Sequence, residues 1–296
     1  MTVLVAGKNG QLADGLSRVA YRRGVPLVAL GREQMNIEDT ESIRTAMLAF
    51  KPRVLINAAA YTAVDQAESE PERAFALNRD GAALLAAAAA EFAVLYIHVS
   101  TDYVFDGHKT SPYIEEDSPA PLNVYGRSKL AGEQAVSDAC PWALTLRTSW
   151  LYHPRGHNFL RTMLRHAATR DAVTVVNDQR GAPTAAEDMA GAILDIAGQL
   201  RTSDHRSGIY HLTAAGETTW FGFAAAIFQR WAKHGRRVPE LIPVTTAQYR
   251  TPARRPANAC LDCSKIARDF GIRLPLWQDA VCSCVDELAT VAEEIF

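Results

Sequence analysis

The sequence predicts an α/β fold in which a doubly wound parallel sheet is followed by a smaller C-terminal α/β domain. Short apolar and β-branched runs alternate with helix-forming segments down to about residue 150, which predicts a parallel sheet with right-handed crossovers. Beyond that point the alternation loosens, although helices over 158–170 and 187–200 and a strand over 173–177 are still indicated. We therefore expect one domain over 1–150, to which later segments return, and a second mainly over 151–296.

The first expected strand, residues 2–6, ends at a glycine-rich turn that reads Gly-Lys-Asn-Gly-Gln-Leu, and an amphipathic segment follows. This order is typical of a Rossmann-type dinucleotide-binding unit, where backbone N–H groups at a helix N-terminus approach a pyrophosphate. Ala13 stands where the fingerprint has its third glycine, a position that needs only a small residue. For this stretch alone, an ordinary helix cap is the alternative.

The second strand, residues 25–30, ends at Gly31 and Arg32, and residues 40–50 predict a helix. A Rossmann unit meets the adenosine ribose at the end of this strand. Position 31 carries no carboxylate for the ribose hydroxyls, whereas the Arg32 guanidinium suits a 2′-phosphate. We therefore expect NADPH to be the preferred cofactor, with NADH possible.

The third and fourth strands, 53–57 and 94–99, flank an Ala-rich helical stretch over 72–91. Small residues at 58–60 would let the backbone lie against a flat cofactor ring, and packing of alanine under a helix is the alternative reading. Periodicity places Asn78 on the inner face of the helix. Hydroxyl and carboxyl side chains at 100–102 follow the fourth strand, at the sheet edge where doubly wound folds bind ligands.

Tyr125 and Lys129 are four residues apart, so on a helix they share one face with Cβ atoms about 5–6 Å apart. A tyrosine pKa is ordinarily about 10, and lowering it to about 7 requires roughly 4 kcal/mol of preference for the phenolate. A neighbouring ammonium in a dry pocket supplies such a preference. The spacing therefore predicts that Tyr125 is an acid whose pKa Lys129 lowers.

Composition restricts the partners. The net charge is -2 and there is no basic run, which argues against nucleic acid or a membrane surface and favours a small ligand. No signal peptide and no run of 18 apolar residues is present, so we expect a cytoplasmic protein. The cysteines number five, an odd count consistent with reduced thiols. Two close pairs approximate a zinc pattern, but one is spaced by a single residue, so incidental thiols are favoured.

Two later loops are candidates for ligand binding. Residues 178–184 form a polar loop whose shape a Gly and a Pro restrict. Residues 251–256 place Arg254 and Arg255 between prolines, and arginine is the side chain suited to bidentate phosphate binding. Solvated surface is the alternative for both loops. We expect Arg254 and Arg255 to hold the phosphates of the substrate.

Residues 7–12, 100–105 and 123–133 together resemble the extended short-chain dehydrogenase/reductase family. With residues 57–68, 147–152, 177–184 and 251–256, the similarity narrows to the dTDP-4-dehydrorhamnose reductase family and covers nearly the whole chain. The resemblance implies that the 4-keto group of dTDP-4-dehydro-L-rhamnose is reduced with NADPH or NADH, in dTDP-rhamnose and cell-surface polysaccharide biosynthesis.

The resemblance also implies roles for individual residues. The expected catalytic residues are Thr101, Tyr125 and Lys129, and the last would also bind the nicotinamide ribose. The expected cofactor-binding residues, in addition to Arg32, are Gly7, Gly10, Gln11, Leu12, Ala60, Tyr61, Thr62 and Val99, with Tyr125 and Lys129. The expected substrate-binding residues are Thr101, Asp102 and Trp150, together with Arg254 and Arg255.

Three alternatives stay open: a reductase of another nucleotide 4-keto sugar, a non-catalytic regulatory subunit of the same fold, and an epimerase or dehydratase with tightly held NAD. Some members of the family bind Mg²⁺ at a dimer interface through three Glu side chains. Two of those positions correspond to Glu187 and Glu287, but the first corresponds to Gly15. We therefore expect a weak or missing Mg²⁺ site and a monomer or a metal-independent homodimer.

Overall fold

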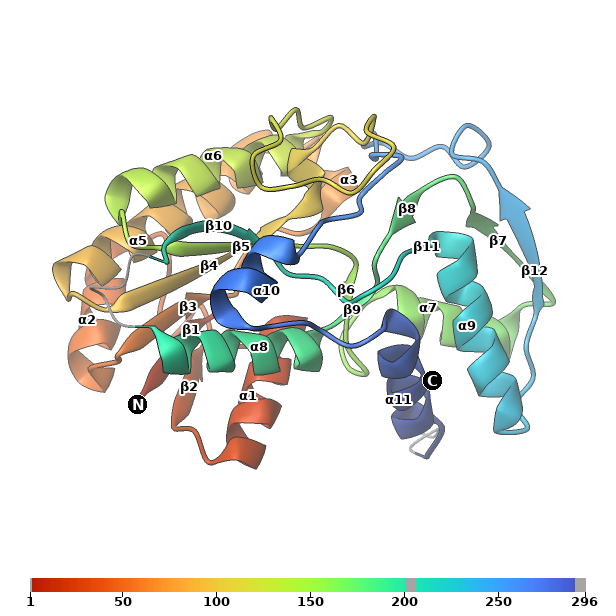
Figure 1. The fold of residues 1–296 in the computed structure, drawn as a ribbon, viewed down its shortest axis with the longest axis horizontal. Coiled ribbons are helices and arrows are strands. Elements are labelled where there is room, and N and C mark those ends of the chain that lie inside the picture. Colours follow the sequence, from red (N-terminus) through yellow and green to blue (C-terminus); the bar gives the residue numbers. More distant parts are fainter. Residues whose placement is uncertain (1, 201–205, 291–296) are drawn as a thin grey trace.

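A computed structural model describes residues 2–200 and 206–290. It confirms the α/β fold: one six-stranded sheet has the order β10-β5-β4-β3-β1-β2, and all of its neighbouring strands are parallel (Figure 1). The strands are β1 (Val3–Ala6), β2 (Leu27–Leu30), β3 (Val54–Asn57), β4 (Leu95–Thr101), β5 (Leu144–Thr148) and β10 (Gly208–His211). Because β10 is part of this sheet, a segment after residue 150 contributes to the same sheet as the N-terminal strands.

Helices cover both faces of the sheet (Figure 1). Successive strand residues point to opposite faces, so Val3 and Val5 pack with α1 (Gln11–Arg23) and α8 (Ala186–Gln199). Leu4 and Ala6 pack on the other face with α2 (Thr40–Phe50) and α5 (Ala82–Glu91). The inner strands β1 and β3 are buried on both sides, which explains why they read as continuous apolar runs.

The stretch predicted as one helix over 72–91 is interrupted by a π-helical turn. It consists of α4 (Pro71–Phe75), the turn η1 (Ala76–Gly81) and α5. The turn brings the backbone of Asn78 against α6 (Val124–Ala139), where a Cβ on Gly132 would lie 2.0 Å from the Asn78 carbonyl oxygen. As expected, Asn78 is buried. Its Oδ1 accepts from the Tyr61 N–H at 2.8 Å, and its Nδ2 donates to the Tyr61 carbonyl oxygen at 3.0 Å.

The C-terminal part has a core of its own. It is built from α7 (Phe159–Thr169), α9 (Trp220–Lys233) and α11 (Trp277–Thr290), with β7 (Ala172–Val176) paired to β12 (Glu240–Val244). Two short pairs, β6 (Leu151–Tyr152) with β9 (Thr184–Ala185) and β8 (Arg180–Gly181) with β11 (Thr218–Thr219), lie between this core and the sheet (Figure 1). The predicted helices and strand of this region are found within a residue or two of their expected bounds.

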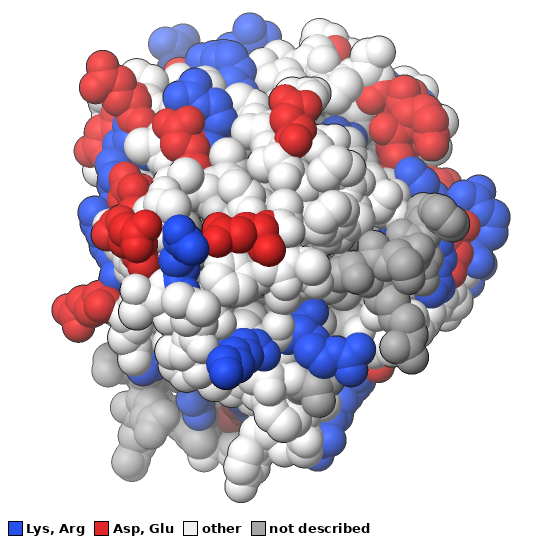
Figure 2. Space-filling view, turned by 90° about the vertical axis from the view of Figure 1, so that its left-hand side faces the viewer, with Lys and Arg blue, Asp and Glu red and all other residues white. Residues whose placement is uncertain are grey.

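The surface agrees with a near-neutral chain. Figure 2 shows Lys and Arg interspersed with Asp and Glu over the face that looks left in Figure 1, with wide uncharged areas between them. Within residues 2–200 and 206–290, no helix is long and apolar enough to cross a membrane.

Candidate active site

A cavity of about 570 Å³ runs along the carboxyl ends of β1, β3, β4 and β5. A second cavity, of about 260 Å³, continues it toward the end of β2, and the two share Asn9, Gly10 and residues 58–60. We call the two together the groove. Of the expected site residues, the structure places these along it: Gly7, Gly10, Gln11, Leu12, Arg32, Ala60, Thr62, Val99, Thr101, Asp102, Tyr125, Lys129 and Trp150.

The glycine turn is shaped for a close backbone approach. Gly7 has a φ of 108°, and a Cβ there would lie 2.8 Å from the Ala59 nitrogen, so only glycine fits. Gly10 is the N-cap of α1 and has an extended backbone conformation. A Cβ there would meet only backbone atoms, the carbonyl oxygens of Gly7 and Ala58. The first N–H groups of a helix have no intrahelical partner, so the start of α1 offers donors to the groove. These residues fit the pyrophosphate of a dinucleotide.

The start of α6 holds Tyr125 and Lys129 in the groove. Asn123 caps the helix, its Oδ1 accepting from the Gly126 N–H at 2.8 Å. A Cβ on Gly126 would lie 2.2 Å from the Tyr103 carbonyl oxygen, so glycine allows the helix to lie against the 3-10 turn η2 (Asp102–Val104). Both side chains therefore face the carboxyl end of β4, as their spacing predicts.

The pKa of Tyr125 differs from the expectation. Burial raises it to about 12, while a hydrogen bond to Thr101 acts in the opposite direction and the charge of Asp102 raises it further. The Nζ of Lys129 donates to the Val99 carbonyl oxygen at 2.6 Å and lies 3.4 Å from His98 Nε2. Burial lowers the pKa of Lys129 itself to about 8. The chain's own groups thus keep Tyr125 protonated instead of making it a strong acid.

A buried polar chain behind Lys129 was not anticipated from the sequence. Asn57 accepts from the Ala59 N–H at 3.0 Å, and its Nδ2 lies 3.1 Å from His98 Nδ1. Burial, and then the Lys129 charge, lower the pKa of His98 well below its ordinary value, so this histidine is neutral. These hydrogen bonds connect the backbone after β3, at Ala59, to the Lys129 ammonium. His98 sits within an apolar run, and nothing in the pattern distinguished it from a core residue.

Thr101 and Asp102 form a hydrogen-bonded pair beside Tyr125. Thr101 Oγ1 donates to Asp102 Oδ1 at 2.9 Å and accepts from the Tyr103 N–H at 3.2 Å. Asp102 is 2% exposed, and burial raises its pKa to about 7. Within the described part of the chain its Oδ2 has no hydrogen-bond partner, although the residue lines the groove. A buried acceptor without a partner is costly, which marks this oxygen as a contact point for a ligand.

Trp150 closes the groove on the side of the C-terminal core. Its φ is 47°, an uncommon backbone conformation for a residue other than glycine. Its ring stacks on Trp220 at 3.7 Å, and a Cβ on Gly181 would lie 2.5 Å from it. Trp220, the first residue of α9, also lines the groove and was missed by the sequence analysis. An aromatic at a helix start carries no sequence signal of its own.

Three expected ligand-binding residues lie elsewhere. Tyr61 is absent from the described lining of the groove, and its hydroxyl donates to Glu70 at 2.8 Å. Arg255 pairs with Asp65 of α3 (Val64–Ala67) at 2.7 Å, and Arg254 is exposed while its carbonyl accepts from Asn123. Neither guanidinium is among the described residues that line the groove, so phosphate binding by this loop stays a prediction.

The guanidinium of Arg18 lies between Glu187 and Glu287, the two positions that correspond to Mg²⁺ ligands in some family members. Arg18 Nε lies 2.9 Å from a Glu187 oxygen, and its Nη2 lies 2.9 Å from a Glu287 oxygen. A Cβ on Gly15 would come within 2.9 Å of the Ala186 carbonyl oxygen, so α1 and α8 leave no space for a carboxylate there. Asp14 is directed at His153 instead, at 3.4 Å. These residues do not fit Mg²⁺, and in the described ranges no three His, Cys, Asp or Glu side chains are grouped to hold a metal.

Comparisons with known proteins agree with this geometry. The family model described as the RmlD substrate binding domain matches residues 1–290. Over 95% of its length the chain is 46% identical to the dTDP-4-dehydrorhamnose reductase of Sinorhizobium fredii, 95% of which is covered. It is 41% identical to that of Escherichia coli K12, with 98% of this chain and 99% of the relative covered. The solved Bacillus anthracis dTDP-4-dehydrorhamnose reductase in complex with NADP is 31% identical, with a TM-score of 0.90 over 97% of this chain and 99% of that one.

Proposed function

The chain belongs to the RmlD substrate binding domain family, and from this premise we infer that it reduces the 4-keto group of dTDP-4-dehydro-L-rhamnose to dTDP-L-rhamnose with NADPH or NADH. The observation that supports this most is the groove itself. It places a protonated Tyr125, the Thr101 hydroxyl and the Lys129 side chain next to a glycine turn suited to a pyrophosphate. The proposed proton donor and the proposed cofactor site therefore lie next to each other in the groove.

The proton transfer follows from the pKa of Tyr125. When bound, NADPH supplies the hydride for the keto carbon, and the ketone oxygen becomes an alkoxide. An alkoxide is about as basic as hydroxide, the conjugate base of water with a pKa of about 15.7. A phenol with a pKa of about 12 donates to it downhill and stays in the donor form at neutral pH. Tyr125 thus acts as the acid, with the Thr101 hydroxyl beside it in the groove.

Lys129, on this proposal, is positioned to bind the nicotinamide ribose. Its ammonium donates to the Val99 carbonyl oxygen and lies next to His98, and these contacts hold it at the end of β4. The substrate then contacts the free oxygen of Asp102 and the stacked rings of Trp150 and Trp220. Because Trp220 begins a helix of the C-terminal core, the sugar nucleotide lies between that core and the sheet.

The decisive assay mixes the purified chain with enzymatically made dTDP-4-dehydro-L-rhamnose and NADPH, and follows loss of NADPH absorbance with identification of the product. Stoichiometric oxidation of NADPH and formation of dTDP-L-rhamnose are expected. A chain that binds the sugar but oxidises no cofactor would be a regulatory subunit, and turnover without added reductant would indicate an epimerase or dehydratase. Either result overturns the proposal.

Tyr125→Phe removes only the proton donor, so we expect kcat to fall by roughly 10² to 10⁴ fold. NADPH affinity should change little, because the ring and its packing are retained. The matched control is Tyr103→Phe. It removes the hydroxyl of a neighbouring tyrosine, whose ring packs edge-on against that of Tyr125. Near-normal turnover in Tyr125→Phe would exclude this residue as the acid.

A further inference from the structure

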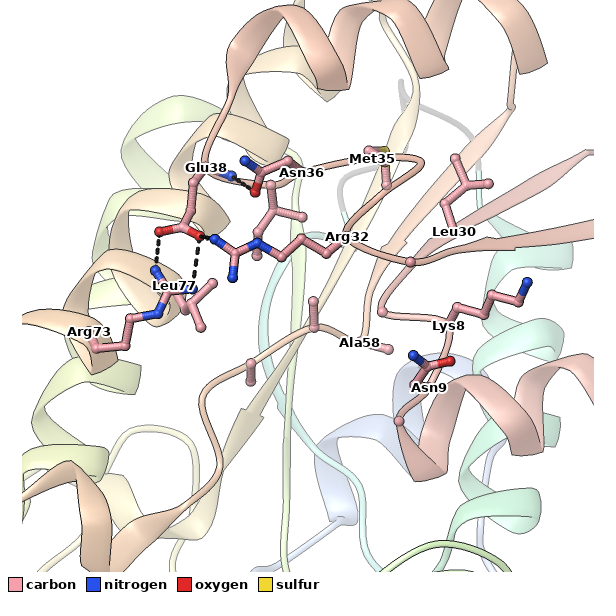
Figure 3. Close-up of a pocket in the computed structure, with 16 residues that line it drawn as sticks. Lys8, Asn9, Leu30, Arg32, Met35, Asn36, Glu38, Ala58, Arg73 and Leu77 are labelled. Atoms are coloured by element: carbon pink, nitrogen blue, oxygen red, sulfur yellow. Dashed lines mark hydrogen bonds and ion pairs between the residues drawn. The ribbon is translucent and has the colours of Figure 1, made fainter. Parts of the chain in front are cut away.

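The adenosine end of the groove carries both signs of charge (Figure 3). Three cationic side chains, Lys8, Arg32 and Arg73, and one carboxylate, Glu38, line this cavity of about 260 Å³. The glycine turn and residues 58–60 form its other walls, so it continues directly from the pyrophosphate position. In a Rossmann unit this is where the adenosine ribose and its 2′-substituent lie.

Glu38 was not expected there. Position 31 is glycine, but the chain after β2 bends back and brings Glu38 into the same cavity. Its backbone N–H donates to Asn36 Oδ1 at 3.3 Å, which helps to hold the bend. A carboxylate therefore lines this cavity although position 31 does not supply it.

Both oxygens of Glu38 are occupied by guanidinium groups (Figure 3). Arg73, from α4, bonds both of them, Nη1 with Oε1 and Nη2 with Oε2 at 3.0 Å. Arg32 makes one longer contact, Nη2 to Oε2 at 3.3 Å, and its side chain is 69% exposed against 35% for Arg73. The bidentate pair is the stronger of the two, so Arg32 is the guanidinium that can move to a ligand.

We propose that Arg73 sets the choice of cofactor by masking Glu38, which leaves Arg32 and Lys8 to receive the 2′-phosphate of NADPH. The inference rests on the proposed function, because it assumes that the groove binds a nicotinamide dinucleotide. A 2′-phosphate carries about two negative charges, and an unmasked carboxylate beside it repels them. The same carboxylate, once unmasked, accepts hydrogen bonds from the free ribose hydroxyls of NADH. Arg73 thus acts through Glu38 as a positioning residue.

The proposal requires opposite effects from two substitutions. Arg73→Gln unmasks Glu38 and leaves it to pair with Arg32, so the NADPH dissociation constant should rise about tenfold while that of NADH stays within about twofold or falls. Glu38→Gln frees both guanidinium groups and should tighten NADPH binding, while NADH binding should change little because the masked carboxylate does not bind the ribose. In the double variant the carboxylate and its mask are both absent, so the ratio of the two constants should return toward that of the unaltered chain.

The test measures the dissociation constants of NADPH and NADH by calorimetry, without sugar, for the unaltered chain and the three variants. Arg79→Gln is the matched control, since Arg79 follows Arg73 by six residues, pairs with Asp80 at 2.6 Å and is not among the described residues that line the cavity. The changes in NADPH affinity should shrink in about 1 M salt, where charges are screened. Equal weakening of both cofactors by Arg73→Gln, or weaker NADPH binding in Glu38→Gln, overturns the proposal. If the unaltered chain binds neither cofactor, the proposed function itself fails.

Discussion

Glu133→Ala should destabilise the fold by about 3 to 5 kcal/mol, because it leaves the Arg147 guanidinium buried without its counter-ion. Glu133 and Arg147 are 4% and 1% exposed, and their side chains form a bidentate pair with distances of 2.9 and 2.6 Å. Glu133 also accepts from the Ser100 hydroxyl at 2.5 Å. The pair joins α6 to the ends of β4 and β5, beside the residues proposed to be catalytic.

The assay is urea-induced unfolding followed by the fluorescence of the five tryptophans. Alongside Glu133→Ala, the double variant Glu133→Leu/Arg147→Met replaces the ion pair by apolar side chains of similar volume. Such replacements are often neutral for stability, so the double variant should be more stable than the single one. A loss below about 1 kcal/mol in Glu133→Ala, or a double variant less stable than the single, would refute the reasoning, since it depends on an uncompensated buried charge.

Two further predictions follow from the site. Burial lowers the pKa of Lys129 from 10.5 to about 8. Between these two pH values the unfolded chain binds more protons than the folded one, so the free energy of unfolding should increase with pH. Lys129→Met should flatten that increase in unfolding experiments from about pH 8 to 10. A stability that falls with pH in this window, relative to the variant, would contradict the assigned shift. Because Arg18 takes the position between Glu187 and Glu287, activity and oligomeric state should be unchanged by EDTA, as checked by light scattering with and without added Mg²⁺. A dimer that dissociates on chelation and re-forms with Mg²⁺ would show the interpretation of this cluster to be wrong.

Local pattern predicted the features that depend on neighbours in sequence. The continuous apolar run of β1 follows from its burial on both faces, and the four-residue spacing of Tyr125 and Lys129 is consistent with both lining the groove. Glu38 and Arg73 escaped notice because their pairing joins residues 35 apart. Which long-range partner a charged side chain meets depends on how helices pack across the sheet, and periodicity carries no information about that.

The same limit applies to the contacts of Lys129. Helical spacing brings an ammonium and a phenol to one face, but it does not say which acceptor the ammonium will choose once both are buried. A buried ammonium requires hydrogen-bond acceptors, and the Val99 carbonyl at 2.6 Å is a better one than a neutral phenol. The ammonium therefore bonds to the end of β4, and burial keeps the pKa of Tyr125 at about 12. For a reaction that must deliver a proton to an alkoxide, a donor that remains protonated at neutral pH meets the requirement without an acidified tyrosine.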